Sequence, residues 1–235
     1  MTELLYLHDS YLKEFDATVT GTDGAGVILD RTAFYAGGGG QPADTGTLEW
    51  GGTIVPVTDM RRVGSDVLHL AGENPPPAGT PVRGALDWER RYAIMRHHSA
   101  LHVLVGVVYK VFGAMVTGGA IYPDRARMDF SLEDLNKDRV AAIEQEANRV
   151  IAEGHRILVR YVPREEYERS DLTRLAKNLL PPEVTEVRVV EIEGFDAQAD
   201  GGTHVANTRE IGSLLVTKTE NKGKTNRRLE IALRA

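Results

Sequence analysis

The sequence predicts an α+β protein with a β-rich first part and a mixed second part. The first ninety or so residues contain short runs of β-branched and apolar residues separated by glycine-rich turn signals. After Asp87 the apolar residues recur with the 3.6-residue period of helices, and further β-rich runs follow. We therefore expect a small β-barrel-like domain over residues 1–88 and an α+β domain over residues 89–235.

The elements of the first domain follow from turn signals. Asp23-Gly24 separates two β-rich runs, as in a hairpin, and Gly51-Gly52 and Gly64-Ser65-Asp66 separate further short strands within 44–72. The segment 72–84 contains four prolines and ends this pattern. Short strands at this spacing favour a small barrel or sandwich.

The second domain begins with a predicted helix over 90–112, which Gly113 ends. A second helix is expected to start at Ser131, where the sequence SLED approaches a capping box, and to end at Gly154. Strands are expected over 156–162 and 186–194, with a charged helical segment over 164–180 between them. Two last strands are expected around an Asn-Lys-Gly turn at 221–223.

Composition limits the classes of function. The chain has 235 residues, a net charge of −6 and no cysteine, and no run approaches the roughly 18 apolar residues of a membrane span. The N-terminal segment lacks the pattern of a signal peptide. We therefore expect a cytoplasmic protein without disulfides and without a membrane partner. Nothing in the sequence calls for an obligate protein partner.

The C-terminal segment is basic although the chain is acidic. From residue 218 onward the only acidic residues are Glu220 and Glu230. The basic residues are Lys218, Lys222, Lys224, Arg227, Arg228 and Arg234. An acidic protein with one basic end can still bind a phosphate backbone locally. A solvated charged tail is the simpler interpretation on charge alone.

Three of the seven histidines lie in the short stretch RHHSALHVL, residues 96–104. His98 and His102 are four residues apart, so on a helix their imidazoles leave the same face and can converge on one metal ion. His97 points about 100° away. The spacing alone is weak evidence, and a zinc-protease motif is disfavoured because Ser99, not glutamate, follows the first of the pair.

A second stretch, DGGTH at 200–204, places Asp200 and His204 around two glycines. Both are acceptable zinc ligands, and Gly201-Gly202 are expected to let the backbone turn so that both side chains face one point. With the two helical histidines they would make a tetrahedral site of three nitrogens and one oxygen. The simpler alternative is an Asx turn with a surface histidine.

Four consecutive glycines, Gly37, Gly38, Gly39 and Gly40, precede Gln41. Such a run allows the backbone to approach a ligand closely, although a floppy loop is the alternative. It is not a phosphate-binding P-loop, because no Gly-Lys-Ser/Thr follows.

Taken together, RHHSALH, DGGTHVANTREIG, FYAGGGGQPADTG and the ENKGKTNRR tail resemble the editing domain of alanyl-tRNA synthetase. They are closer still to its free-standing relatives, the AlaX trans-editing proteins of the longer type with an extra N-terminal domain. The resemblance covers nearly the whole chain. It implies an editing domain of the threonyl/alanyl-tRNA synthetase type and an aminoacyl-tRNA deacylase that uses Zn²⁺. Its substrate would be alanine-specific tRNA carrying serine, chiefly, or glycine.

The resemblance also implies roles for single residues. His98 and His102 match the family's zinc pair, with Ser99 where threonine is usual, and His204 matches the histidine of its C-G-G-T-H motif. Gln41 matches the glutamine that borders the amino-acid pocket, so we expect the glycine loop to line that pocket, with Gln41 or Ser99 as partner of the serine hydroxyl. The tRNA acceptor stem is expected to contact Lys218, Lys222, Lys224, Arg227 and Arg228.

Position 200 departs from the family pattern, because aspartate stands where cysteine is usual. Carboxylate is a harder ligand than thiolate and carries the same charge. Three roles for Asp200 remain open. It ligates zinc directly, which is the role we prefer, it binds zinc through a water molecule, or it acts as a base. Two rival functions follow: a metal-free, inactive tRNA-binding module of the same fold, and a zinc hydrolase for small esters. Two measurements separate these two functions from the zinc-dependent tRNA deacylase. One is the metal content, and the other compares hydrolysis of mischarged tRNA with hydrolysis of a small aminoacyl ester.

Overall fold

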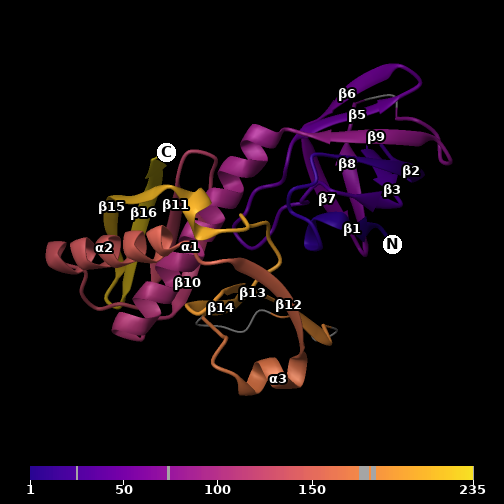
Figure 1. Ribbon diagram of the computed structural model, residues 1–235. Coiled ribbons are helices and arrows are strands. Elements are labelled where there is room, and N and C mark those ends of the chain that lie inside the picture. Colours follow the sequence, from indigo (N-terminus) through magenta and orange to yellow (C-terminus); the bar gives the residue numbers. More distant parts are fainter. Residues whose placement is uncertain (25, 73–74, 175–179, 181–183, 235) are drawn as a thin grey trace. The chain divides into compact units, whose positions relative to one another are not determined.

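The computed structural model describes residues 1–24, 26–72, 75–174, 180 and 184–234 (Figure 1). They form two compact units, Met1–Ala93 and Ile94–Ala235. Both units are rich in antiparallel strands, and helices are few, so the chain has the mixed α and β composition that the sequence predicts. No described helix combines the length and the apolar character that a membrane crossing requires.

In the described part of the first unit, seven strands form one antiparallel sheet. Its order is β6-β5-β9-β2-β3-β8-β7, and the short parallel pair β1-β4 lies outside it. The strands are β1 (Glu3–Leu4), β2 (Glu14–Asp23), β3 (Gly26–Leu29), β4 (Arg31–Thr32), β5 (Gly46–Trp50), β6 (Thr53–Val57), β7 (Asp59–Val63), β8 (Asp66–Leu70) and β9 (Pro81–Leu86). The glycine turns at 51–52 and 64–65 connect strands as predicted. Among the described pairings β6 and β7 remain the two ends of the order, so the closure that a barrel requires is not seen.

The side chains of β2 alternate between buried and exposed positions, as expected for a strand with one face on a core. Phe15, Ala17 and Val19 are its buried residues and join Leu29, Phe34 and other apolar side chains in one cluster. This cluster stabilises the unit through the burial of apolar surface.

The glycine run forms a closed turn between β4 and β5. All four glycines have positive φ angles, from 58° to 135°, which other residues rarely adopt. Gly38 and Gln41 exchange two backbone hydrogen bonds of 3.0 and 2.9 Å across the turn. The Tyr35 hydroxyl donates to the Gly38 carbonyl at 2.9 Å. The turn is therefore held by defined contacts, and the alternative of a floppy loop is wrong.

A buried ion pair holds the C-terminal side of this turn. The Asp44 carboxylate accepts from the backbone N–H of Tyr35 at 2.6 Å and from Nε of Arg91 at 2.9 Å. Arg91 is fully buried, and its other nitrogens donate to the carbonyl oxygens of Ser10 and Ala33. Because Arg91 and Asp44 are buried and paired, this network fixes the glycine turn relative to the first turn of helix α1 (Trp88–Phe112).

The described residues of the second unit form two antiparallel sheets. One has the order β10-β11-β16-β15, with β10 (Val116–Ile121), β11 (Ala126–Phe130), β15 (Ser213–Gly223) and β16 (Asn226–Arg234); the other has the order β12-β13-β14, with β12 (Ile157–Pro163), β13 (Glu186–Ile192) and β14 (Asp196–Ala199). The strands β12 and β13 match the predicted ones. Sequence patterns did not indicate β10, β11 or β14.

Helix α1 is the central element of the second unit. Between Ile94 and Val108 every residue except Arg96 is buried, which explains why the stretch is apolar on all sides. The helix ends at Phe112, and Gly113 follows with a φ of 64°, as predicted.

Helix α2 (Lys137–Glu153) covers the edge strand β15 (Figure 1). The Asn148 amide donates to the carbonyl of Leu214 and accepts from its N–H, and Glu144 accepts from the N–H of Val216. These contacts satisfy backbone groups that an open edge would leave exposed.

Two predicted boundaries are wrong. Helix α2 is capped by Asn136, whose side chain accepts from the N–H of Arg139, because the Ser131 hydroxyl instead accepts from the N–H of Met115. Its end at Gly154 is confirmed. The last hairpin turns at 224–225, after β15 has run through Gly223, and not at 221–223.

The predicted helical segment over 164–180 is only partly helical. Helix α3 spans Arg164–Arg169 and ends where the Ser170 hydroxyl bonds the carbonyl of Tyr167. The rest of the prediction partly falls on residues 175–179, which lie outside the described residues.

Candidate metal centre

Four side chains of the second unit converge on one point. His98 and His102 come from α1, and Asp200 and His204 come from the loop after β14. One ligand atom of each lies within 4.8 Å of those of the other three, and the three imidazole centroids are 4.2–5.1 Å apart. The helical histidines and the DGGTH stretch, which the sequence analysis combined into one expected site, lie together in one cluster. His97, one residue away, is not part of it.

The distances within the cluster fit a tetrahedral metal site. His98 Nε2 lies 3.5 Å from one Asp200 oxygen, and His204 Nε2 lies 3.0 Å from the other. Four ligands about 2.0–2.1 Å from a zinc ion are separated by about 3.4 Å. The buried Nδ1 of His102 has no hydrogen-bond partner among the described residues. A buried nitrogen without a partner is costly, and a metal ion would satisfy it.

The turn that carries Asp200 is closed by the aspartate itself. Its carboxylate accepts from the N–H of Gly202 at 2.6 Å, which is an Asx turn. The backbone turns at the two glycines so that Asp200 and His204 face one point, as expected, and it does so without a positive φ angle at Gly201 or Gly202. The Asx turn leaves the same carboxylate facing His98 and His204, so it is compatible with the predicted ligand role.

Ser99 lies behind the cluster. It is fully buried, its Oγ is 3.1 Å from Nδ1 of His204, and it accepts from the N–H of Val205 at 3.2 Å. With Nδ1 held in this way, Nε2 of His204 points to Asp200. Such outer contacts fix the orientation of a metal-ligating imidazole. Its predicted role as partner of a substrate hydroxyl stays a prediction.

Burial sets the protonation of the cluster. It lowers the pKa of His204 to about 4, assisted by nearby His98, and lowers the pKa of His102 well below its ordinary value. Burial alone would raise the pKa of Asp200, but His98 and His204 hold that pKa well below its usual value. His102 and His204 are therefore neutral and Asp200 is ionised at pH 7. These are the protonation states that metal ligation requires.

A buried arginine adjoins the aspartate. Arg188, on β13, donates from Nη1 to the Asp200 carbonyl at 2.9 Å, and that nitrogen lies 4.0 Å from the Asp200 carboxylate. In return the Asp200 N–H donates to the Arg188 carbonyl. The arginine therefore holds the turn and places a positive charge beside the cluster.

A second set of contacts supports the helix from behind. The Gln198 amide donates to the carbonyl of His102 and to Asp196, both at 2.9 Å, and Arg174 donates to the other Asp196 oxygen at 2.6 Å. Sequence reasoning missed these residues and Arg188. One signal was available: Asp196, Gln198 and Asp200 alternate with alanines, as on the polar face of a strand.

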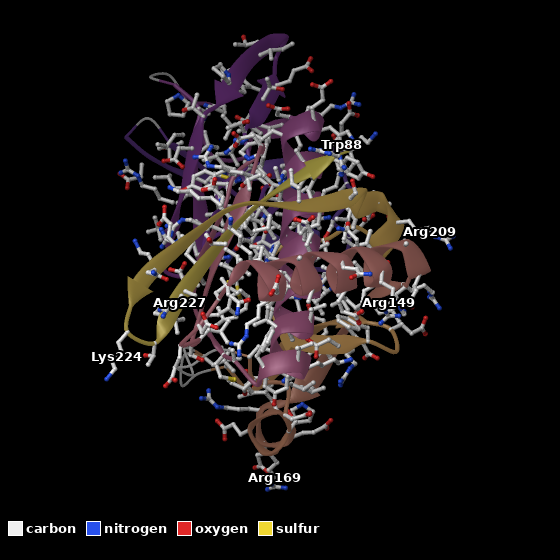
Figure 2. The ribbon with its side chains drawn as sticks, turned by 90° about the vertical axis from the view of Figure 1, so that its left-hand side faces the viewer. Trp88, Arg149, Arg169, Arg209, Lys224 and Arg227 are labelled. Carbon is white, nitrogen blue, oxygen red and sulfur yellow. The ribbon has the colours of Figure 1, made fainter. Side chains whose placement is uncertain are left out.

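The predicted tRNA-binding cations lie on the β15–β16 hairpin, with Lys224 and Arg227 near its tip (Figure 2). Most of them form ion pairs or hydrogen bonds with residues of the hairpin or of neighbouring segments. Lys218 and Lys222 pair with Glu220, and Arg228 forms two bonds of 2.6 and 2.8 Å with Asp129. Arg227 donates to backbone carbonyls, including that of Gly223 at 2.6 Å. No ion pair of Lys224 occurs within the described residues.

The predicted pocket residues, the glycine turn and Gln41, belong to the first unit. Gln41 is buried, with 3% of its surface exposed. Their role in substrate binding stays a prediction.

Comparisons with known proteins agree with these features. The family model described as "Threonyl and Alanyl tRNA synthetase second additional domain" matches residues 187–230, and that of "tRNA synthetases class II (A)" matches residues 3–90. The chain is 45% identical, over 99% of its length and 97% of the relative's, to alanyl-tRNA editing protein AlaX-M of Methanosarcina mazei. The chain belongs to the AlaX-M family. The AlaX-M protein of Saccharolobus solfataricus is 43% identical, with 97% of this chain and 98% of that protein covered.

AlaX-M proteins share this sequence with part of a larger enzyme. The alanine–tRNA ligase of Thermococcus kodakarensis is 42% identical over 93% of this chain, which corresponds to 24% of the ligase. In this AlaX-M chain the match to the additional-domain model includes Arg188, Asp200 and His204, whereas His98 and His102 lie outside both matched segments. The resemblance predicted from the motifs is thereby confirmed.

Proposed function

We propose that this AlaX-M protein is a zinc-dependent aminoacyl-tRNA deacylase that edits in trans. Its proposed substrate is alanine-specific tRNA that carries serine or, secondarily, glycine. The observation that carries the proposal is the buried cluster of three histidines and one aspartate, in a chain related over its whole length to proteins named alanyl-tRNA editing proteins. The proposed compartment is the cytoplasm, as the cysteine-free sequence predicts.

In this proposal His98, His102, Asp200 and His204 hold the metal. When bound, zinc supplies a Lewis acid that stabilises negative charge on an ester oxygen. The protein orients the donors: Ser99 holds His204, the N–H of Gly202 holds one Asp200 oxygen, and Arg188 holds the Asp200 carbonyl. Because these partners are buried, each contact acts in a medium of low dielectric and keeps its geometry.

Selection of serine is the harder task, because serine differs from alanine by one hydroxyl. A site that hydrogen-bonds this hydroxyl discriminates against alanine, which would leave the partner group buried and unpaired. We assign this role to Gln41 and the glycine turn. The assignment rests on the match of Gln41 to the family's glutamine; in the structure the turn has a defined backbone and Gln41 is buried. The basic hairpin would contact phosphates, which position the tRNA without specifying the amino acid.

Metal content and deacylation test the proposal together. The purified protein should hold about one zinc per chain, and it should deacylate seryl-tRNA faster than alanyl-tRNA, with glycyl-tRNA measured alongside. His98→Ala should remove metal and activity, whereas His97→Ala, a buried neighbour outside the cluster, is the matched control. Full activity in a metal-free preparation contradicts the zinc assignment. Binding of tRNA without hydrolysis supports an inactive tRNA-binding module. Hydrolysis of small esters without hydrolysis of aminoacyl-tRNA supports a zinc hydrolase for small esters.

A further inference from the structure

A row of three side chains leads across the three-stranded sheet to the cluster. Tyr161 of β12 is paired with Arg188 of β13, and the N–H of Asp200 donates to the Arg188 carbonyl, which extends the row beyond β14. Directly paired residues of neighbouring strands point to the same face of a sheet. Asp200 belongs to the metal cluster, so all three side chains lie on the face that carries it.

The opposite face confirms this assignment. Val162, Val187 and Val189 form an apolar cluster, against which Ala197 and Ala199 pack. These residues alternate along their strands with Tyr161, Arg188 and Asp200, and alternate residues point to opposite faces. The apolar core and the polar row therefore occupy the two faces of one sheet.

The end of the row on the edge strand is its most exposed part. Arg188 is buried, with 8% of its surface exposed, whereas Tyr161 on the edge strand is 44% exposed. Val159, two residues earlier on the same face, is 43% exposed. An exposed tyrosine is ordinary by itself. This one lies at the open end of a row whose other end is the proposed reaction centre.

Arg188 provides the middle of the row with unused donor capacity. Its Nη1 donates to the Asp200 carbonyl, but its buried Nε has no partner among the described residues. The buried guanidinium therefore places a positive charge between the cluster and Tyr161. The row thus presents, in order, a carboxylate in the metal cluster, a cation and an aromatic face.

We propose that Tyr161 is a stacking platform for the terminal adenine of the tRNA. This inference rests on the proposed function and deepens it. In an aminoacyl-tRNA the ester joins the amino acid to the ribose of the terminal adenosine, so an ester bound at the cluster has its nucleoside beside it. Two strand spacings, about 10 Å in all, separate the strands of Asp200 and Tyr161, which suits the extent of one nucleoside. Aromatic side chains bind bases by stacking, independently of the amino acid.

The test uses the full-length protein and a ligand that is not hydrolysed, 3′-deoxy-3′-(serylamino)adenosine, with calorimetric measurement of Kd. Tyr161→Ala should weaken binding about 5- to 150-fold, the range for loss of one stacked base. Tyr161→Phe should bind like the wild type. Tyr161→Thr, which removes the ring but favours a strand, is a second variant in case alanine disturbs the edge strand. Tyr122→Ala, which alters a tyrosine that contacts Arg125, is the control.

A second ligand, the same seryl amide on a ribose without a base, separates stacking from a structural effect. Loss of the base should weaken binding to the wild type and leave the Kd of Tyr161→Ala unchanged, because the two changes remove the same contact. Equal weakening in both proteins, or an unchanged Kd of the adenosine ligand in Tyr161→Ala, overturns the proposal. The readout needs no hydrolysis, so an inactive protein that binds the ligand through Tyr161 contradicts the deacylase assignment and leaves this inference standing.

Discussion

Replacement of Ser99 by alanine should weaken metal binding and leave the amino-acid preference intact. The hydroxyl is fully buried between Nδ1 of His204 and the N–H of Val205. A hydroxyl can both donate and accept. Without metal, Nε2 of His204 is free to donate to Asp200 while Nδ1 accepts from Ser99. A metal bound at Nε2 would leave the proton of the imidazole on Nδ1. The Ser99 hydroxyl would then accept a hydrogen bond from Nδ1–H.

The expected magnitudes follow from the contacts that are lost. In the metal-free protein the N–H of Val205 is left buried without a partner, which costs about 1–3 kcal/mol of the free energy of unfolding. In the metal-bound protein Nδ1–H of His204 is also orphaned. Loss of such a supporting contact lowers metal affinity about 10- to 100-fold. Ser99→Ala should therefore reduce zinc affinity beyond its effect on stability.

The assay combines a zinc titration against a competing chelator with urea unfolding of the metal-free protein. Ser99→Thr keeps the hydroxyl and should retain zinc, and Ser131→Ala removes an exposed hydroxyl outside the cluster, so its zinc affinity should match the wild type. The ratio of seryl- to alanyl-tRNA deacylation should not change in Ser99→Ala. Normal zinc affinity together with a lost ratio would refute the reasoning and favour contact of this hydroxyl with the substrate.

Three further changes test other parts of the structure. Asp200→Ala should weaken zinc binding while Asp200→Cys keeps it; normal metal affinity with a lower rate in Asp200→Ala would instead indicate a base. The pKa of buried His69 is lowered from 6.5 to about 4 by desolvation, so the unfolded chain binds the proton first. About 3 kcal/mol of stability should be lost between pH 6.5 and 4, and urea unfolding of His69→Gln should show a smaller loss. Gln41→Ala should change the preference for serine over alanine at unchanged salt dependence. Neutralising Lys222, Arg227 and Arg228 should weaken binding of all tRNAs and lower the salt slope by about one unit per lost contact; a loss of preference in this triple variant would contradict the division of roles.

The sequence was informative where a local rule suffices. The spacing of His98 and His102 needs only the helical period, and the end of α1 needs only Gly113, so both were predicted. The cap at Ser131 failed because its hydroxyl has two possible uses, and the one realised, a bond from Met115, depends on a strand that local patterns did not indicate.

The supporting contacts of the cluster could not be predicted in this way. Arg188 lies in the run VRVV, where a single arginine indicates the exposed face of a strand. Its burial depends on Asp200, which lies twelve residues away in sequence and meets it only through strand pairing. The glycine turn is similar, because the residue that holds it, Arg91, is on another element. Sequence therefore indicated the four residues of the cluster and missed Arg188, which holds the turn of Asp200.

The absence of sulfur from the donor set has a consequence for oxidative stress. Thiolate ligands are lost when peroxide converts them to sulfenic acid or a disulfide. Here the position usual for cysteine in the family is Asp200, and the chain has no cysteine at all. Imidazole and carboxylate do not enter that oxidation sequence. Translation errors rise when a proofreading enzyme is inactivated. On the proposed assignment, peroxide removes no ligand from the metal site of this protein, so editing should persist in cells exposed to peroxide.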